Sequence, residues 1–173
     1  MRKFFVIAAA TALMASSAAA IAPGSYGLGF TSSAAPVGGY YQATDVLGIT
    51  GGLGLESFDS GNTNFYLEVG LPITMHSGDR SWFGIRPGVG FANFSPDDSS
   101  SKTAFGNRSL ADGTALQFQA WLFYMWMATD NVGINFYHGL NINTYSPEEG
   151  DSVTDFTTAG ANATGGGIYY FFE

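Results

Sequence analysis

Glu56, Glu68 and Arg86 are the charged residues whose positions suggest chemistry inside the fold. Around each of them, large apolar residues alternate with small or polar ones, and the charge falls in the polar series. Because successive side chains of a β-strand point to opposite faces, all three charges are expected on the face away from the apolar one. Pairing the strands of Glu68 and Arg86 across the turn between them sets Arg86 opposite Gly70, diagonal to the carboxylate and within its reach. We interpret these charges as a structural ion pair that fills the interior; a gate or proton path is the alternative, which would need surrounding water.

His138 is the other residue that could do chemistry, because it falls in the apolar series between Phe136 and Leu140. A histidine serves as the base of a nucleophilic enzyme only with a hydroxyl group within hydrogen-bond reach. The expected neighbours of His138 on the preceding strand are Ala120 and Leu122, and its own strand holds no serine. We therefore expect an interfacial or packed histidine in a protein that is not an enzyme.

The stretch 65–75 shows most clearly which elements position these residues. Its odd positions are all large and apolar, and its even positions are polar, small or amphipathic. The same alternation along the rest of the chain predicts eight strands. They cover residues 24–31, 37–44, 46–58, 63–75, 81–94, 114–127, 131–144 and 157–172.

The connections between these strands alternate between short and long. An even number of strands places both termini at one end of an up-and-down barrel and the long loops, 95–113 and 145–156, at the other. Merging residues 37–58 into one strand would instead put loop 95–113 at the end of the termini, so eight strands are preferred. The predicted turns are 44–45, 76–80 and 128–130, and the predicted loops are 32–36, 59–62, 95–113 and 145–156.

Three positions fit this pattern poorly. Pro72 and Pro87 lie inside predicted strands, where proline cannot donate to the ladder, so a bulge or a broken ladder is expected near each. In the last strand the apolar series changes phase between Ala163 and Ile168. A bulge at 165–167 is expected to shift the register by one residue and keep both apolar sets on one face.

The first twenty residues are a predicted signal peptide. Arg2 and Lys3 precede an apolar stretch at 4–13 and the small residues 18–20. Cleavage after residue 20 leaves 21–173 as one domain. No later run reaches the roughly 20 apolar residues of a membrane-spanning helix. Behind a secretion signal, the alternating pattern favours a barrel that spans a membrane with strands.

Composition excludes several functions. Without Arg2 and Lys3, four basic residues remain against fourteen acidic ones, which argues against nucleic acid as a partner. The absence of cysteine excludes disulfides, thiolate metal sites and a cysteine nucleophile. The acidic residues of the two long loops have no calcium-loop spacing, so we expect a solvated surface and no bound metal or cofactor, with bridging divalent cations as the alternative.

Aromatic residues gather near the end of the predicted barrel that holds the termini. Amphipathic rings sit at the boundary between lipid headgroups and acyl chains, so these residues are expected to form the periplasmic aromatic girdle. They are Tyr41, Phe83, Tyr124, Trp126, Tyr170 and Phe172.

The last residues of the chain resemble the C-terminal assembly signal of bacterial outer-membrane barrels. In that signal a glycine is followed by aromatic or apolar residues at alternating positions, and Gly167, Tyr170 and Phe172 match it. With the signal peptide and eight alternating segments, the chain resembles the small eight-stranded outer-membrane barrels typified by OmpA and OmpX. The resemblance implies insertion by the outer-membrane assembly machinery, but no particular activity.

These observations predict an all-β protein: an eight-stranded antiparallel up-and-down transmembrane β-barrel in a Gram-negative outer membrane. Membrane lipids and lipopolysaccharide are its expected surroundings, and loops 95–113 and 145–156 are the expected contact sites for an extracellular partner. A structural or surface-interaction role is the first hypothesis, and a carrier or narrow channel for small hydrophobic molecules is the second. A lipid-modifying enzyme is third, and a soluble secreted barrel with its large apolar residues turned inward is fourth.

Overall fold

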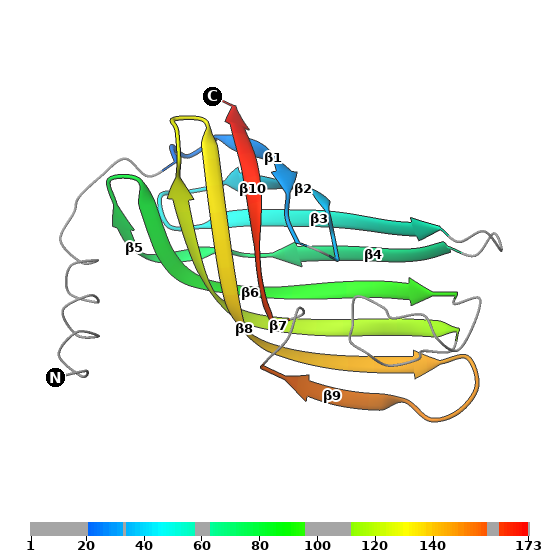
Figure 1. The fold of residues 1–173 in the computed structure, drawn as a ribbon. Coiled ribbons are helices and arrows are strands. Elements are labelled where there is room, and N and C mark those ends of the chain that lie inside the picture. Colours follow the sequence, from blue (N-terminus) through cyan, green and yellow to red (C-terminus); the bar gives the residue numbers. More distant parts are fainter. Residues whose placement is uncertain (1–20, 33, 58–62, 96–111, 159–162, 173) are drawn as a thin grey trace, which may run out of the picture.

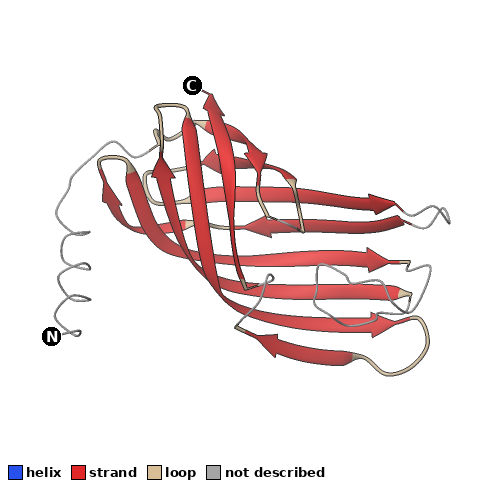
Figure 2. Ribbon diagram, viewed as in Figure 1, coloured by secondary structure: helices blue, strands red, loops and turns tan. Residues whose placement is uncertain are grey.

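The computed structural model describes residues 21–32, 34–57, 63–95, 112–158 and 163–172. Every regular element in these ranges is a β-strand (Figure 2). None of the described residues form a helix long and apolar enough to cross a membrane. The strands are β1 (Tyr26–Phe30), β2 (Val37–Gln42), β3 (Gly48–Ser57), β4 (Thr63–Gly70), β5 (Ile73–Gly78), β6 (Ser81–Phe94), β7 (Gly113–Met127), β8 (Val132–Pro147), β9 (Val153–Thr157) and β10 (Thr164–Phe172).

These segments form a closed, antiparallel barrel of eight strands. Each strand pairs with its neighbour in the order β1, β2, β3, β4, β6, β7 and β8, and β10 closes the ring between β8 and β1. The other two segments are continuations: β5 extends the line of β4 along β6, and β9 precedes β10 along β8. The prediction of an eight-stranded antiparallel barrel is therefore confirmed, with two of its strands interrupted.

The barrel is taller on one side than on the other. Strands β3, β4 and β6 to β9 extend well beyond β1, β2 and β10 at the end away from the termini (Figure 1). The short strands gather at the opposite end, where β1 begins and β10 finishes. We call these the outer end and the inner end of the barrel.

Side chains alternate between the two faces of the barrel wall, because each strand is pleated. On β4, Leu67 and Val69 are exposed, whereas Glu68 between them is 1% exposed. On β7, Gln117 is buried and Phe118 is exposed. The outer face of the barrel is therefore apolar, and its interior, the lumen, takes the polar and the remaining aromatic side chains.

The two prolines explain why the fourth predicted strand is divided. Leu71 donates its backbone N–H to the carbonyl oxygen of Pro87 over 2.9 Å, but Pro87 has no N–H to return. The ladder is interrupted at this point, between the end of β4 and the start of β5. The broken ladder expected at Pro72 is thus present. The broken ladder expected near Pro87 is this same interruption, and on its other side Pro87 pairs with Ala120 without a register shift.

The last strand also differs from the prediction. No bulge occurs at 165–167, because β10 keeps one register against β8 throughout. Instead the register slips between β9 and β10: Thr157 is level with Asn141, whereas Thr164 is level with His138. From Asn141 to His138 is three residues along β8, whereas from Thr157 to Thr164 is seven residues along the last strand, so the register slips by four. The slip is an even number of residues, so the even-numbered residues of both strands face outward. Ala163, expected on the outer face, is buried in the barrel instead.

The outer connections are only partly as predicted. Most of the predicted loop 145–156 was wrong, because β8 continues to Pro147 and β9 begins at Val153, which leaves a loop at 148–152. Residues 145–147 and 153–156 belong to a hairpin that prolongs the sheet at the outer end. Of the predicted loop 95–113, residues 96–111 lie outside the part of the chain that the structure describes.

The lumen is filled in two layers. Its inner half holds a packed cluster of aromatic and methionine side chains together with Ile21. Its outer half holds a polar network and a smaller cluster around Tyr66 and Phe94. Eight strands enclose a lumen just wide enough for such a filling. The members of the inner cluster are Ile21, Tyr40, Trp82, Trp121, Phe123, Met125, Met127, Tyr137, Tyr169 and Phe171.

Candidate functional site

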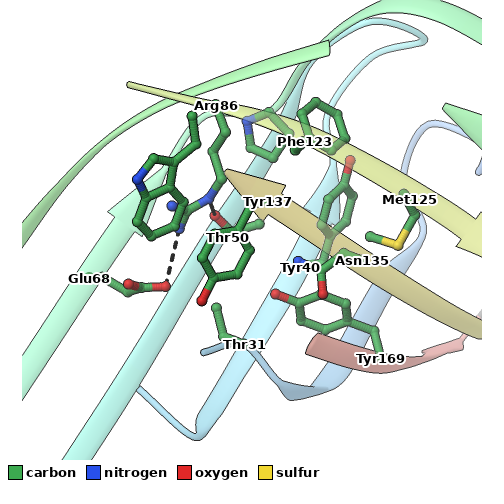
Figure 3. A pocket seen from close by; sticks show the side chains of 12 residues that line it. Thr31, Tyr40, Thr50, Glu68, Arg86, Phe123, Met125, Asn135, Tyr137 and Tyr169 are labelled. Carbon is green, nitrogen blue, oxygen red and sulfur yellow. Dashed lines mark hydrogen bonds and ion pairs between the residues drawn. The ribbon is translucent and has the colours of Figure 1, made fainter. Parts of the chain in front are cut away.

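The lumen is built around one ion pair. Arg86 on β6 and Glu68 on β4 are 4% and 1% exposed, and Nη2 of Arg86 lies 3.3 Å from Oε1 of Glu68. The guanidinium also donates from Nε to Oγ1 of Thr50 over 2.9 Å and from Nη1 to Oε1 of Gln119 over 2.8 Å. It lies 4.8 Å from the ring centre of Trp121. Figure 3 shows the guanidinium between the Glu68 carboxylate and Thr50.

The predicted contact between Arg86 and Glu68 is present, but by a different route. Arg86 is level with Pro72, two residues beyond the predicted Gly70. Two local features cause the difference: Gly78 pairs directly with Ser81, so the predicted turn 76–80 is shorter than expected, and the register shifts by one residue between Thr74 and His76. Arg86 therefore extends along the lumen wall and passes over Gly70 to reach the carboxylate.

Glu56 does not belong to this ion pair, contrary to the prediction. It follows the inward series of β3, but it lies near the outer end of that strand, where its side chain is exposed. Its Oε2 accepts a hydrogen bond of 3.3 Å from Nδ2 of Asn64. Alternation fixes the face of a residue and not its depth in the lumen, which is why the sequence did not separate Glu56 from Glu68.

A network of amides extends the ion pair toward the outer end. The hydroxyl of Tyr66 lies 3.2 Å from Oε2 of Glu68 and 3.1 Å from Oε1 of Gln117 and can donate to one of them at a time. Gln119 donates to Oε1 of Gln117 over 2.6 Å, and Gln117 donates to Oδ1 of Asn143 over 2.8 Å. The buried charges are thus surrounded by groups that hydrogen-bond to them, as buried charges require.

Trp121 separates this network from the aromatic half of the lumen. Its indole stacks on Tyr137 with ring centres 4.3 Å apart and an angle of 8° between the planes. Its Nε1 donates to Oδ1 of Asn141 over 2.7 Å, so the buried polar end of the ring is satisfied.

A small cavity remains where the two halves meet (Figure 3). Its volume is about 10 Å³, which is the space of one water molecule. Three buried oxygen atoms on its wall have no hydrogen-bond partner in the described residues: Oγ1 of Thr31, Oδ1 of Asn135 and the hydroxyl of Tyr169. Thr31 follows β1, Asn135 lies on β8 and Tyr169 on β10, so these oxygen atoms come from the three strands that close the ring. The rest of the cavity wall comes from the other strands of the barrel.

A shallower hollow of about 440 Å³ opens at the inner end. Ile21, Asp45, Thr74 and His76 contribute to its wall. No group of three or more metal-binding side chains, such as histidine with carboxylates, occurs here or elsewhere in the described ranges.

On the outer wall, His138 has a hydroxyl neighbour that the sequence did not reveal. Its Nδ1 lies 2.6 Å from Oγ1 of Thr164, which is level with it on β10. On the other side it is level with Leu122, as expected. Closure of the ring makes β10 the second neighbour of β8, and this pairing brings the Thr164 hydroxyl beside His138. No carboxylate bonded to this pair is present among the described residues.

The predicted girdle residues all lie toward the inner end of the barrel. Five of them are at least 37% exposed, and Tyr124 is half-buried. Tyr26 belongs with them, because it pairs with both Tyr41 and Phe172 and stacks on the latter with ring centres 5.2 Å apart. Of the C-terminal signal, Tyr170 and Phe172 point outward from β10, and their rings are 5.0 Å apart.

The chain matches no family model, no curated protein and no solved structure. The resemblance to the OmpA and OmpX barrels therefore stays a prediction from the sequence.

The described lumen is a packed polar and aromatic interior. The lumen charges are paired and enclosed, and the cavity beside them has room for water only. The exposed polar groups include the outward His138 and Thr164 and the acidic hairpin loop, where Glu148, Glu149 and Asp151 are exposed.

Proposed function

We propose that this protein is a non-enzymatic integral outer-membrane barrel with a structural or surface-interaction role at its outer end. The observation that carries the proposal is a continuous belt of outward apolar side chains around the closed barrel. A soluble protein rarely exposes a contiguous apolar patch of more than a few hundred Å². An apolar outer face over a polar lumen is the arrangement of a barrel surrounded by lipid.

The height of this belt matches a bilayer. On β7 the outward apolar series runs from Trp126 to Leu116, which are ten residues apart. At roughly 3.3 Å per residue and a strand tilt of about 40°, the series spans roughly 25 Å along the barrel axis, the height of the apolar band of known outer-membrane barrels.

On β6 to β8 the belt ends in polar residues at the outer end, whereas on β3 and β4 the apolar Leu55 and Phe65 lie in the row of Asn93. Val89, Phe118, Ile142 and Phe156 are level with one another on β6 to β9 and form an apolar row. Two rows further out, Asn93, Thr114 and Ser146 are level on β6 to β8, and the hydroxyl of Ser146 is 3.0 Å from that of Ser152. A change from apolar to hydroxyl-bearing side chains is expected where acyl chains give way to headgroups.

The inner boundary of the belt is aromatic. The girdle residues and Tyr26 lie there, in the position that amphipathic rings take at a membrane surface. The predicted signal peptide at 1–20, which lies outside the described residues, and the C-terminal pattern support export and insertion by the outer-membrane assembly machinery. Lipids and lipopolysaccharide are then the surroundings of the belt, and the bacterial outer membrane is the location.

The filled lumen supports a structural or interaction role over a carrier or narrow channel. The sheet that β6 to β9 prolong beyond the short strands, with the acidic loop 148–152, is the surface such a barrel offers to an extracellular partner. The lack of a bonded carboxylate at His138 and Thr164 in the described residues argues against the lipid-modifying enzyme.

Membrane fractionation tests the proposal. The protein should be recovered with the outer membrane and should migrate faster in an unheated than in a heated gel sample, because a closed barrel resists detergent. Recovery in the soluble periplasm would reject the membrane assignment. In planar bilayers the folded protein should give a steady baseline; discrete conductance steps would favour the channel.

A further inference from the structure

His138 and Thr164 lie in the middle of the apolar belt. On β8 the outward series consists of Val132, Ile134 and Phe136 on one side of His138, and Leu140 and Ile142 on the other. Both His138 and Thr164 are exposed on the outer wall. Polar side chains at this depth are rare in membrane proteins because acyl chains offer them no hydrogen bond.

The bond between the two residues does not satisfy them. If Nδ1 of His138 accepts from the Thr164 hydroxyl, then Nε2–H remains as a donor and the hydroxyl oxygen keeps a free lone pair. With the other tautomer, Nε2 is the free acceptor and the hydroxyl hydrogen is the free donor. In either case the pair presents one donor and one acceptor outward, and no further bond to either residue occurs in the part of the chain that the structure describes.

We propose that this pair is the polar centre of a contact between two copies of the barrel within the membrane. One donor and one acceptor form a self-complementary set, so a two-fold axis along the membrane normal would let each copy satisfy the other. Nε2 of His138 in one copy would bond to the Thr164 hydroxyl of the second copy, and the reverse. The inference rests on the proposed function, because the same pair in water would be hydrated.

The surrounding wall favours close approach. Gly166 follows Thr164 in the outward series of β10, and Ala120 lies on the neighbouring β7, level with Leu140. Small residues let two surfaces approach until polar side chains meet across a membrane interface. A lipid molecule cannot take this place, because its acyl chain has neither donor nor acceptor at mid-depth.

Cross-linking tests the position of the contact. The chain has no cysteine, so a single introduced thiol reports on one place only. Leu140→Cys lies beside His138, and Leu53→Cys is the control on β3, four strands away around the ring in either direction. After oxidation in phospholipid vesicles, Leu140→Cys should give a disulfide-linked dimer several times more abundantly than Leu53→Cys. Equal yields would overturn the proposal.

Energy transfer between labelled copies tests the role of the pair. His138→Phe and Thr164→Val should each lower the association constant about tenfold, because two symmetry-related hydrogen bonds are lost. Thr164→Ser, which keeps the hydroxyl, should associate like the wild type. If His138→Phe associates as tightly as the wild type, the proposal is wrong.

Two preliminary measurements distinguish the absence of a dimer from loss of folding and from an incorrect membrane assignment. Each variant is first shown to migrate as a folded barrel, so that loss of association is not loss of folding. Fractionation of the wild type is done independently: a soluble protein rejects the membrane assignment, whereas a monomer that remains membrane-bound rejects the dimer alone.

Discussion

The guanidinium of Arg86 lies directly over the α-carbon of Gly70. A β-carbon added at Gly70 would be 2.3 Å from Cζ of Arg86, well inside van der Waals contact. The absence of a side chain at Gly70 therefore leaves the space that the Arg86 side chain needs to reach Glu68. Arg86 is level with Pro72, four residues from Glu68. Its role is steric, since a positive φ angle does not occur at Gly70.

Gly70→Ala should displace the guanidinium and separate it from Glu68 and Thr50. We expect the free energy of unfolding to fall by about 2–4 kcal/mol, since a buried charge then loses its partner. Gly51→Ala is the matched control on β3, because its nearest neighbour would be 3.8 Å away. Urea titration of both variants in lipid vesicles measures the difference. Equal, small losses for the two glycines would contradict the steric role.

The ion pair itself can be tested by a double-mutant cycle. Arg86→Met or Glu68→Gln alone should each cost about 3–5 kcal/mol of unfolding free energy, because each removes one side of a buried pair. The double variant should cost clearly less than the sum of the two, since no unpaired charge remains. Additive losses would show that the two residues stabilise the barrel independently, which their distance of 3.3 Å argues against.

The sequence predicted the barrel because alternation is a local property. Residues 83–92 and 115–120 alternate between larger apolar and small or polar side chains, and the structure places strands at 81–94 and 113–127. The interruption at Pro72 was also predictable from the missing N–H. The part of Pro87 in the same interruption follows from its own missing N–H, whereas its regular pairing with Ala120 depends on which side of β6 that N–H would face.

Features that depend on register were beyond the sequence. The last strand slips by four residues against β8, and an even slip leaves no trace in the alternation. Thr164 was missed as the neighbour of His138 for two reasons. Only the completed ring brings β10 beside β8, and the slip decides which residue of β10 is level with His138. Glu56 was misplaced because alternation does not report height along the lumen.

Tyr169→Phe tests whether a water molecule occupies the lumen cavity. The Tyr169 hydroxyl has no partner in the described residues. If a water molecule bridges it to Thr31 and Asn135, removal of the hydroxyl should cost about 1 kcal/mol, the usual contribution of a hydrogen bond. Without water, Tyr169→Phe should be neutral or stabilising, because the hydroxyl that it removes is buried and makes no hydrogen bond.

Tyr40→Phe provides the reference for this measurement. Its hydroxyl donates to Oε1 of Gln42 over 2.8 Å, so a loss of about 1 kcal/mol is expected whatever the cavity contains. A crystal structure at high resolution should show one peak within hydrogen-bond distance of the three oxygen atoms. Direct bonds among Thr31, Asn135 and Tyr169, with no peak, would contradict the bridging water.

Arginine substitutions on β6 test the depth of the belt. Ile85 lies outward in the row of His138, and Asn93 lies outward in the hydroxyl row at the outer end. Ile85→Arg should lower the free energy of unfolding in a bilayer by about 2–4 kcal/mol, whereas Asn93→Arg should lower it by about 0–1 kcal/mol. Both are measured by urea titration in vesicles. Equal and small effects would mean that Ile85 faces water.

The role of the C-terminal aromatic residue can be separated from its packing. Phe172 stacks on Tyr26, so Phe172→Ala and Tyr26→Ala both remove this ring contact, and Phe172→Ala also removes the contact with Tyr170. If Phe172 is part of an assembly signal, Phe172→Ala should reduce the amount of folded barrel in the outer membrane several-fold, and Tyr26→Ala should leave it near the wild-type level. Refolding of the two purified variants into vesicles, where no assembly machinery acts, should give yields that differ much less than the amounts in cells, because both variants lose the contact between Tyr26 and Phe172. Equal losses in cells would assign the effect to the ring contact and remove the assembly signal.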